Sequence, residues 1–247
     1  VMLIGIFMML SGSMFEVSGL SMVGLQRLSA TDVETALKLN GTAALDIHPD
    51  EVKAQVSALF PELTDVNVRV GLPAKVEISV RERQPIVAWQ MPEQTVWVDA
   101  EGVIIPARGE VGGLVTLQAD GLPELVAQAN AETASTADGE TTAADLLATM
   151  TTTKTTVAGS RMDLNLLAAA LKLSTQVPEG ASLAYTTNDG LGWADARGWR
   201  VYIGNDLNNL ETKLSEYEAI VAQLTERGIT PVMISVEHLS APFFRTE

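Results

Sequence analysis

The most regular alternation of hydrophobic and polar positions lies between Val66 and Val80. Valine or isoleucine occupies every second position on both sides of a turn at residues 71–74, and polar residues stand between them. Side chains two residues apart share one face of a β-strand. The pattern therefore predicts a hairpin with one buried face and one solvated face.

Two helical patterns precede this hairpin. Ser29 offers an N-cap to a helix that is expected to end near Asn40-Gly41. A second helix begins at Pro49, a residue favoured in the first turn, and carries apolar side chains at helical spacing. With a short strand expected at residues 15–23, the order from 15 to 83 is β-α-α-β-β. This order predicts two helices on one face of a three-stranded sheet.

From Pro85 onward, short stretches of alternating pattern are separated by turn residues and interrupted by two helical stretches. Residues 127–161 are rich in alanine, threonine, serine and glycine. Because few large apolar side chains are present to offset the entropy of ordering, they are expected to form a mobile insertion. The predicted fold class is α+β, with a first domain at 15–84 and a mainly β domain with two packed helices at 85–247. The strands expected in the second domain are 86–89, 95–98, 103–105, 182–186, 191–194, 199–203 and 231–238, and its helices begin near Asp163 and Asn208.

The N-terminal stretch from Val1 to Phe15 contains no charged residue, and Glu16 is the first charge. It is shorter than the roughly 20 apolar residues that span a bilayer. We expect residues 1–14 to be the outer half of a transmembrane helix. The end of a secretory signal is an alternative, because Ser11-Gly12-Ser13 offers small residues for cleavage, and a buried N-terminal helix is another. The first two interpretations place Glu16 onward outside the cytoplasm, and the first of them predicts a single-pass protein of the cell membrane.

The composition limits which partners the chain can bind and which reactions it can catalyse. The chain has 247 residues, 47% of them hydrophobic, which is enough to form buried cores. Its formal charge of −15 argues against a nucleic-acid surface, because phosphate binding needs a basic stripe. It contains no cysteine, which excludes disulfides, thiol nucleophiles and thiolate metal sites.

Side chains suited to catalysis or metal binding are few. His48 precedes the Pro49 helix, where a cap or surface residue is expected, and His238 ends the last predicted strand, where it would face solvent or a partner. No His/Cys zinc site, G-x-S-x-G serine motif or phosphate-binding glycine loop is present. We therefore expect no catalytic residue, cofactor, metal ion or small-molecule substrate. Packing in the core or on a sheet face is expected for the four tryptophans, Trp89, Trp97, Trp193 and Trp199.

Several short sequences occur in a characteristic order along the chain. They are Phe15-Glu16-Val17, Val23-Gly24-Leu25, the 59–63 stretch LFPEL, Glu82-Arg83-Gln84-Pro85, the 97–102 stretch WVDAEG and the 199–204 stretch WRVYIG. In this order the chain resembles the FtsQ/DivIB family of bacterial cell-division proteins. The resemblance implies a POTRA domain followed by a β domain and covers nearly the whole chain except the insertion.

The resemblance also implies a function and a site. Family members are single-pass, extracytoplasmic scaffolds of septum formation that act with FtsB/DivIC and FtsL, upstream of FtsW–FtsI. They bind FtsB by strand addition to the last strand of the β domain and the residues after it, a mode open to a terminal strand with unpaired backbone groups. Where the family often carries an acidic-x-basic pattern, this chain has Ser235-Val236-Glu237. The matching positions for partner binding are Ile234, Ser235, Val236, Glu237, His238, Leu239 and Ser240.

Two other functions are open on the sequence alone. A POTRA protein of outer-membrane assembly or secretion would continue into many alternating strands of about ten residues. An unrecognised wall-modifying enzyme would act on peptidoglycan. The exposed, partly apolar segment Ala241–Arg245 that follows the last predicted strand does not distinguish them.

Overall fold

The computed structural model describes residues 16, 17, 19–71, 74–123, 125, 126, 158–206 and 208–246. The chain forms two compact units, Val1–Gln84 with Arg108–Glu110, and Pro85–Ala107 with Val111–Glu247. In the part of the chain that the structure describes, every helix is too short or too polar to span a bilayer. The expected membrane segment at 1–14 lies outside the described residues.

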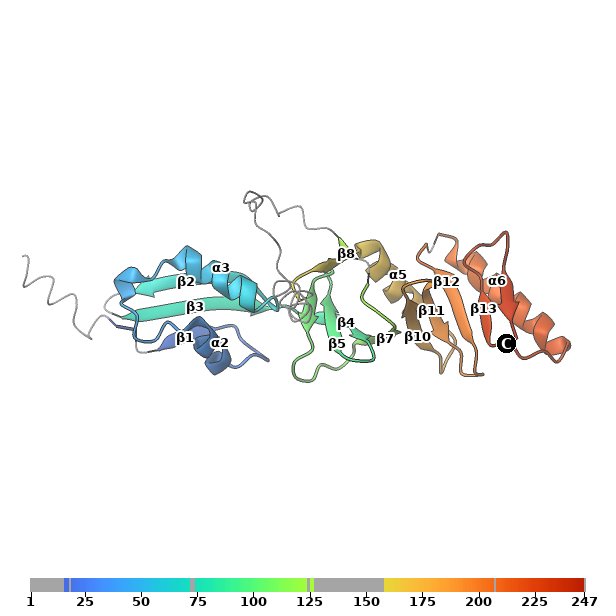
Figure 1. Cartoon of the computed structure of the whole chain (residues 1–247), viewed down its shortest axis with the longest axis horizontal. Helices are drawn as coiled ribbons and strands as arrows, with labels where there is room; N and C mark the ends of the chain where they lie inside the picture. The colour runs from blue at the N-terminus through green and yellow to red at the C-terminus, as the bar shows by residue number, and fades with distance from the viewer. Residues whose placement is uncertain are drawn as a thin grey trace, which may run out of the picture. The chain divides into compact units, whose positions relative to one another are not determined.

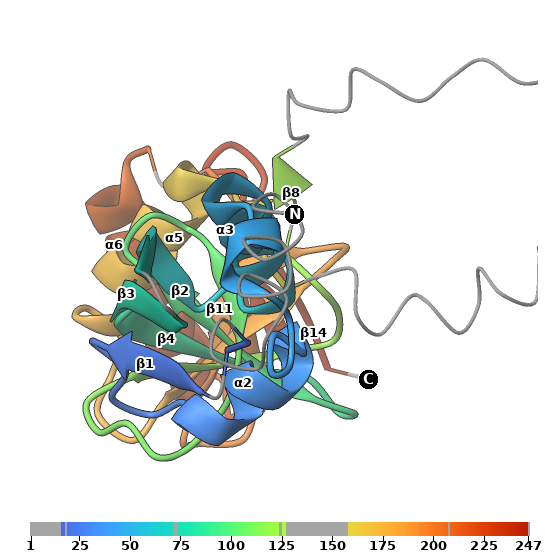
Figure 2. The ribbon, with the colours of Figure 1, turned by 90° about the vertical axis from the view of Figure 1, so that its left-hand side faces the viewer.

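The first unit is a three-stranded sheet covered by helices on one face (Figure 2). The strands are β1 (Leu20–Val23), β2 (Leu63–Gly71) and β3 (Lys75–Glu82), and the helices are α2 (Ala30–Leu37) and α3 (Pro49–Leu59), with a 3-10 turn η2 (Ala44–Asp46) between them. The central strand β3 pairs parallel with β1 and antiparallel with β2. The predicted β-α-α-β-β order and the hairpin are confirmed.

The ends of the two helices follow local sequence signals. The Ser29 side chain accepts a hydrogen bond from the backbone N–H of Thr31 and caps α2. This helix ends earlier than expected, because Lys38 already adopts a left-handed conformation with φ 53°. The second helix, α3, begins at Pro49 as predicted, and His48 occupies its N-cap position without a side-chain capping bond.

The loop from Gly24 to Leu28 is fastened to the end of β3. Gly24 has φ 100°, and a Cβ there would lie 1.9 Å from the carbonyl oxygen of Val80, so only glycine fits this approach. The Glu82 carboxylate accepts hydrogen bonds from the backbone N–H groups of Gln26, Arg27 and Leu28 at 2.6 to 3.1 Å. The Arg27 Nε also donates to it, at 3.1 Å. The carboxylate therefore accepts the hydrogen bonds of loop N–H groups that have no partner in a strand.

The second unit is built on one nine-stranded sheet of order β14-β13-β12-β11-β10-β7-β4-β5-β6. The helices α5 (Leu164–Ser174) and α6 (Leu210–Glu226) contribute to its main core, and α6 lies beside β12 and β13 (Figure 1). The strands are β4 (Pro85–Gln90), β5 (Thr95–Asp99), β6 (Ile104–Pro106), β7 (Val115–Ala119), β10 (Ser182–Thr186), β11 (Gly190–Ala194), β12 (Arg200–Gly204), β13 (Met233–Ser235) and β14 (Phe243–Arg245).

Large side chains fill both sides of this sheet. Trp89 and Trp193 are fully buried in the core that α5 and α6 cover, and Trp199 joins them from the residue before β12. Trp97 belongs to a second cluster with Ala88, Val103 and Ile105. Burial of all four tryptophans confirms the expected packing role. Leu210, Tyr217 and Leu224 of α6 are buried in the main core, so one side of this helix packs on the sheet.

At three places along the chain the structure has strands that the sequence did not predict. The first is β7, which was not predicted although it lies between β4 and β10 and pairs parallel with both. The second is β9 (Arg161–Met162), which pairs with β8 (Leu125–Val126). Because Met162 is 1% exposed and Ser160 accepts a hydrogen bond from Ile104, the end of the expected insertion is ordered; residues 127–157 lie outside the described residues. The third, β14, falls in the segment Ala241–Arg245, which is exposed as expected but for which no strand was predicted.

Candidate functional site

The C-terminal end of the large sheet is made by two three-residue strands. The inner one, β13, pairs parallel with β12 and antiparallel with β14, in the register Met233–Arg245, Ile234–Phe244 and Ser235–Phe243. The prediction that residues 231–238 form the terminal strand is therefore wrong in two respects. The strand is shorter, and a further strand covers its outer side. Among the described residues, the open edge belongs to β14.

The residues predicted to bind a partner fall into two groups. Ile234, Ser235 and Val236 are buried, and the Val236 N–H donates to the carbonyl of Tyr202 at 2.9 Å. A charge or proline at Val236 would therefore damage the fold as well as any interface. The remaining positions lie on the outward turn that leads to β14, where Glu237 is half-buried and the exposed residues are His238, Leu239 and Ser240.

Apolar side chains are exposed around this edge. Phe243 and Phe244 are 46% and 41% exposed, and successive strand residues point to opposite faces. Val232 precedes β13 and is also exposed, and its N–H donates to the Arg245 carbonyl at 2.7 Å. Neither phenylalanine belongs to the hydrophobic core of the unit. This end of the sheet thus combines an open row of backbone groups with exposed apolar side chains, a combination suited to binding a protein segment.

A buried lysine holds the strand end beneath this site. Lys213, on α6, is 4% exposed, and its Nζ donates to the carbonyls of Ile203 at 2.8 Å and Asp206 at 2.6 Å. Burial lowers the pKa of Lys213, and the nearby carboxylates of Asp206 and Glu237 partly oppose that effect. The ammonium group therefore fixes the exit of β12 against α6 and lies near Glu237 of the predicted site.

Replacing Lys213 with methionine, which keeps the length of the side chain, is expected to destabilise the second unit by about 1–3 kcal/mol, because two carbonyls lose a charged donor. Urea unfolding followed by tryptophan fluorescence measures it, since every tryptophan lies in this unit. Lys172→Met, at an exposed position of α5, is the matched control and should change stability by less than about 0.5 kcal/mol. Equal unfolding midpoints for the two variants would contradict the anchoring role of Lys213.

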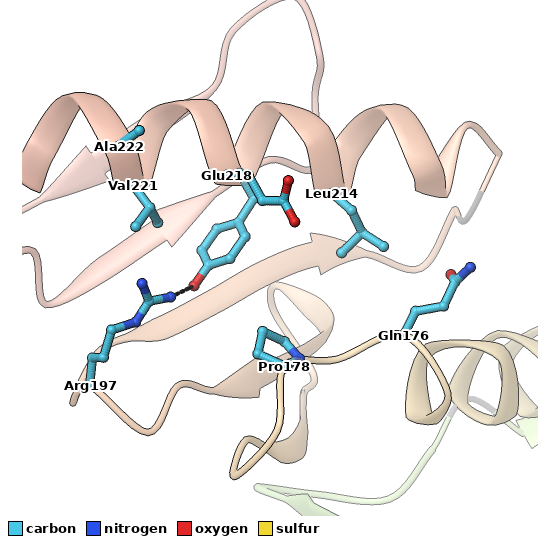
Figure 3. Close-up of a pocket in the computed structure, with 8 residues that line it drawn as sticks. Gln176, Pro178, Arg197, Leu214, Glu218, Val221 and Ala222 are labelled. Atoms are coloured by element: carbon cyan, nitrogen blue, oxygen red, sulfur yellow. Dashed lines mark hydrogen bonds between the residues drawn. The ribbon is translucent and has the colours of Figure 1, made fainter.

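A groove lies alongside α6 in the same unit (Figure 3). Leu214 and Val221 of the helix form an apolar wall, and Pro178 lies opposite them. An adjoining hollow shares Arg197 and Val221 with the groove, so the guanidinium stands where the two hollows meet.

A network of polar groups fixes Arg197 at that position. The Asp195 carboxylate accepts hydrogen bonds from Arg197 Nε at 2.8 Å and Nη2 at 2.9 Å, and from the Tyr217 hydroxyl at 2.6 Å. The guanidinium also lies 4.4 Å from the centre of the Trp199 ring, a cation–π contact. Arg197 is half exposed whereas the Asp195 side chain is 2% exposed, so the pair presents a cation to the groove and keeps the anion beneath it.

The same contacts shift the pKa values of the network. The hydrogen bond from Arg197 is the largest cause that lowers the pKa of Asp195, with the bond from Tyr217 adding to it against the effect of burial. Burial, and then the hydrogen bond to Asp195, raises the pKa of Tyr217 to about 12. At neutral pH the network therefore holds one carboxylate, one guanidinium and a neutral phenol. This arrangement positions groups; it does not supply a base near neutrality.

The geometry of the described residues offers no assembled catalytic centre. No group of three or more histidine, aspartate or glutamate side chains among them could hold a metal ion. Nothing in the sequence pattern predicted that Arg197 and Tyr217 are partners. Arg197 lies in the turn between β11 and β12 and Tyr217 on α6, and their contact depends on how the helix packs on the sheet.

Comparison with known proteins identifies the first unit. Residues 15–83 match the family model described as POTRA domain, FtsQ-type. No curated protein matched the chain. The matched range ends just after Glu82, the residue that fastens the Gly24–Leu28 loop.

Proposed function

We propose that this chain, which the FtsQ-type POTRA domain at residues 15–83 assigns to the FtsQ/DivIB family, is a scaffold of bacterial cell division that binds partner proteins and has no enzymatic activity. The family is one of non-catalytic division scaffolds. The partners proposed here are FtsB/DivIC-like and FtsL-like membrane proteins, which act upstream of FtsW–FtsI in septum formation. Residues 85–247 would then be the β domain that follows the POTRA domain at 15–84.

The observation that carries the partner-binding proposal is the end of the nine-stranded sheet. Beyond β14, the described part of the chain supplies no further strand, so one row of backbone N–H and C=O groups is available. An extended segment of a partner can satisfy such a row and extend the sheet, with its side chains giving specificity. We place the partner on the segment from Ile234 to Ser240 together with the outer strand that follows it.

The proposed location follows from the family assignment. FtsQ-type proteins are typically anchored in the cell membrane, and the uncharged stretch at 1–14 would supply that anchor in the bilayer. Both described units would then lie outside the cytoplasm. The acidic surface, with a formal charge of −15 over the chain, is consistent with a protein that binds neither nucleic acid nor an anionic substrate.

Photo-crosslinking in dividing cells tests this proposal. A photoreactive phenylalanine analogue at Leu239, which is 36% exposed, is expected to crosslink to the FtsB/DivIC-type protein. The same analogue at Glu179, exposed in the same unit but away from the C-terminal strands in sequence, is the matched control and is expected not to crosslink to that protein. Absence of the crosslink at Leu239, or equal crosslinking at both positions, would refute the proposed site. Release of peptidoglycan fragments by the purified chain would refute the non-enzymatic role.

A further inference from the structure

We infer that β14 is a removable cover of the β13 edge: the chain occupies its own partner-binding position with Phe243–Arg245, and an extended segment of the partner must displace it. This inference rests on the proposed function. It differs in the edge used: the partner pairs with β13, which β14 covers in the free protein, and not with the open outer edge of β14, so binding exchanges one antiparallel strand for another.

β14 is held weakly. It has three residues, all of them exposed. Its contacts with the sheet are made through β13 and the bond from Val232, and its two phenylalanines stay outside the core. A strand that fully buries none of its side chains gains less from apolar burial than a core strand, and each of its backbone hydrogen bonds contributes modestly in exchange with water.

The two possible edges differ in the apolar side chains beside them. Ile234 of β13 and Val236 just after it are both 0% exposed and both part of the main core. A segment that pairs directly with β13 therefore has buried apolar neighbours. A segment added outside β14 would have only the half-exposed side chains of Phe243–Arg245 beside it. The edge of β13, which β14 covers, is therefore the more favourable edge for pairing with a partner strand.

The connection between β13 and β14 is short. The chain reverses after Val236 through a turn in which the Ala241 N–H donates to the His238 carbonyl at 3.0 Å. Because this link is short, β14 competes at an effective concentration of about millimolar, so it covers the edge although each contact is weak. A longer partner segment with better side chains can still replace it.

The register of β14 indicates what the incoming segment should carry. Phe244 stands opposite Ile234, whose side chain lies in the core. Directly opposite residues share a face of an antiparallel pair. The partner segment is therefore expected to run antiparallel to β13 and to place a large apolar side chain opposite Ile234, where it packs better than the exposed Phe244.

A reversible crosslink tests the inference, because the chain has no cysteine of its own. Met233 and Arg245 are directly paired, and facing residues of an antiparallel pair have Cα separations of about 4.5–5.5 Å, which suit a disulfide. In the double variant Met233→Cys/Arg245→Cys, oxidation locks β14 in place. Affinity for the purified ectodomain of the FtsB/DivIC-type partner is expected to fall about tenfold or more, which corresponds to about 1.4 kcal/mol, and reductant is expected to restore it.

The outcomes separate the inference from the proposed function. Equal or tighter binding by the oxidised form would overturn the inference and leave the proposed function standing, since the partner would then add outside β14. Absence of binding by the reduced variant and by the unsubstituted chain would overturn both. As a second measure, Phe244→Gly weakens β14 and is expected to tighten binding several-fold. Weaker binding by this variant would also overturn the inference.

Discussion

Substituting glutamine for Glu82 is expected to destabilise the first unit by about 2–4 kcal/mol, the range for removing one partner of a buried charged network. The carboxylate side chain is 1% exposed and accepts from Gln26, Arg27 and Leu28 and from the Arg27 guanidinium. A glutamine has one acceptor oxygen and turns an N–H₂ group toward amides that are themselves donors. The Gly24–Leu28 loop is expected to open first.

The pH dependence of the first unit should follow the same residue. Burial by itself would raise the pKa of Glu82, but the hydrogen bonds from Gln26, Leu28 and Arg27 outweigh it, so the pKa is lowered. A carboxyl group whose pKa is lower in the folded state contributes stability above its unfolded pKa of about 4.3. That contribution is lost as the pH falls through the folded pKa. The Glu82→Gln variant should lack this part of the acid sensitivity.

Hydrogen exchange of the amides in β3 and the Gly24–Leu28 loop measures the effect, because the first unit has neither tryptophan nor tyrosine. Asp65→Asn is the matched control. The Asp65–Arg81 pair is 2.6 Å apart but 61% and 71% exposed, so its loss should cost no more than about 1 kcal/mol. Asparagine also tolerates the positive φ of 53° at this position. Similar exchange rates in the two variants would contradict the role assigned to Glu82.

Substituting asparagine for Asp195 is expected to destabilise the second unit by about 2–4 kcal/mol, because Arg197 and the Tyr217 hydroxyl lose a buried anionic acceptor. The guanidinium should become mobile in the groove beside α6. The pKa of Tyr217, raised to about 12 by burial and by Asp195, should move back toward its ordinary value when the neighbouring charge is removed. The pKa of Asp195 is lowered, so its contribution to stability is present above the unfolded pKa of about 3.9 and lost at lower pH.

Urea unfolding followed by tryptophan fluorescence measures the loss of stability, and ultraviolet titration of the tyrosines measures the shift at Tyr217. Asp189→Asn is the control, since the hydrogen bonds of Asp189 within the described part of the chain are exposed ones with Thr186. It should stay within about 0.5 kcal/mol of the unsubstituted chain. An unchanged midpoint for Asp195→Asn, with an unchanged tyrosine titration, would show that the network does not hold Arg197.

The sequence by itself determined the elements whose signals are local. The β2–β3 hairpin follows from strict alternation, and α3 begins where Pro49 can occupy a first turn. The predicted alternation ended at Val80, but Glu82 shares parity with Val76, Ile78 and Val80, and the structure buries it with them. A glutamate buried at that position needs hydrogen-bond donors from elsewhere in the same chain. Which groups bind it was not readable, because the loop amides lie more than fifty residues earlier.

Only the tertiary structure decided the composition of the candidate site. Strands of three residues, such as β13 and β14, carry too little periodicity to be separated from a turn. An edge is a property of pairing between distant segments, so the order of elements along the chain could not show that β14 lies outside β13. Likewise, Asp195 and Tyr217 meet across 22 positions because a turn and a helix pack on the same sheet. Periodicity records which side of an element is buried; what that side touches depends on how the elements pack.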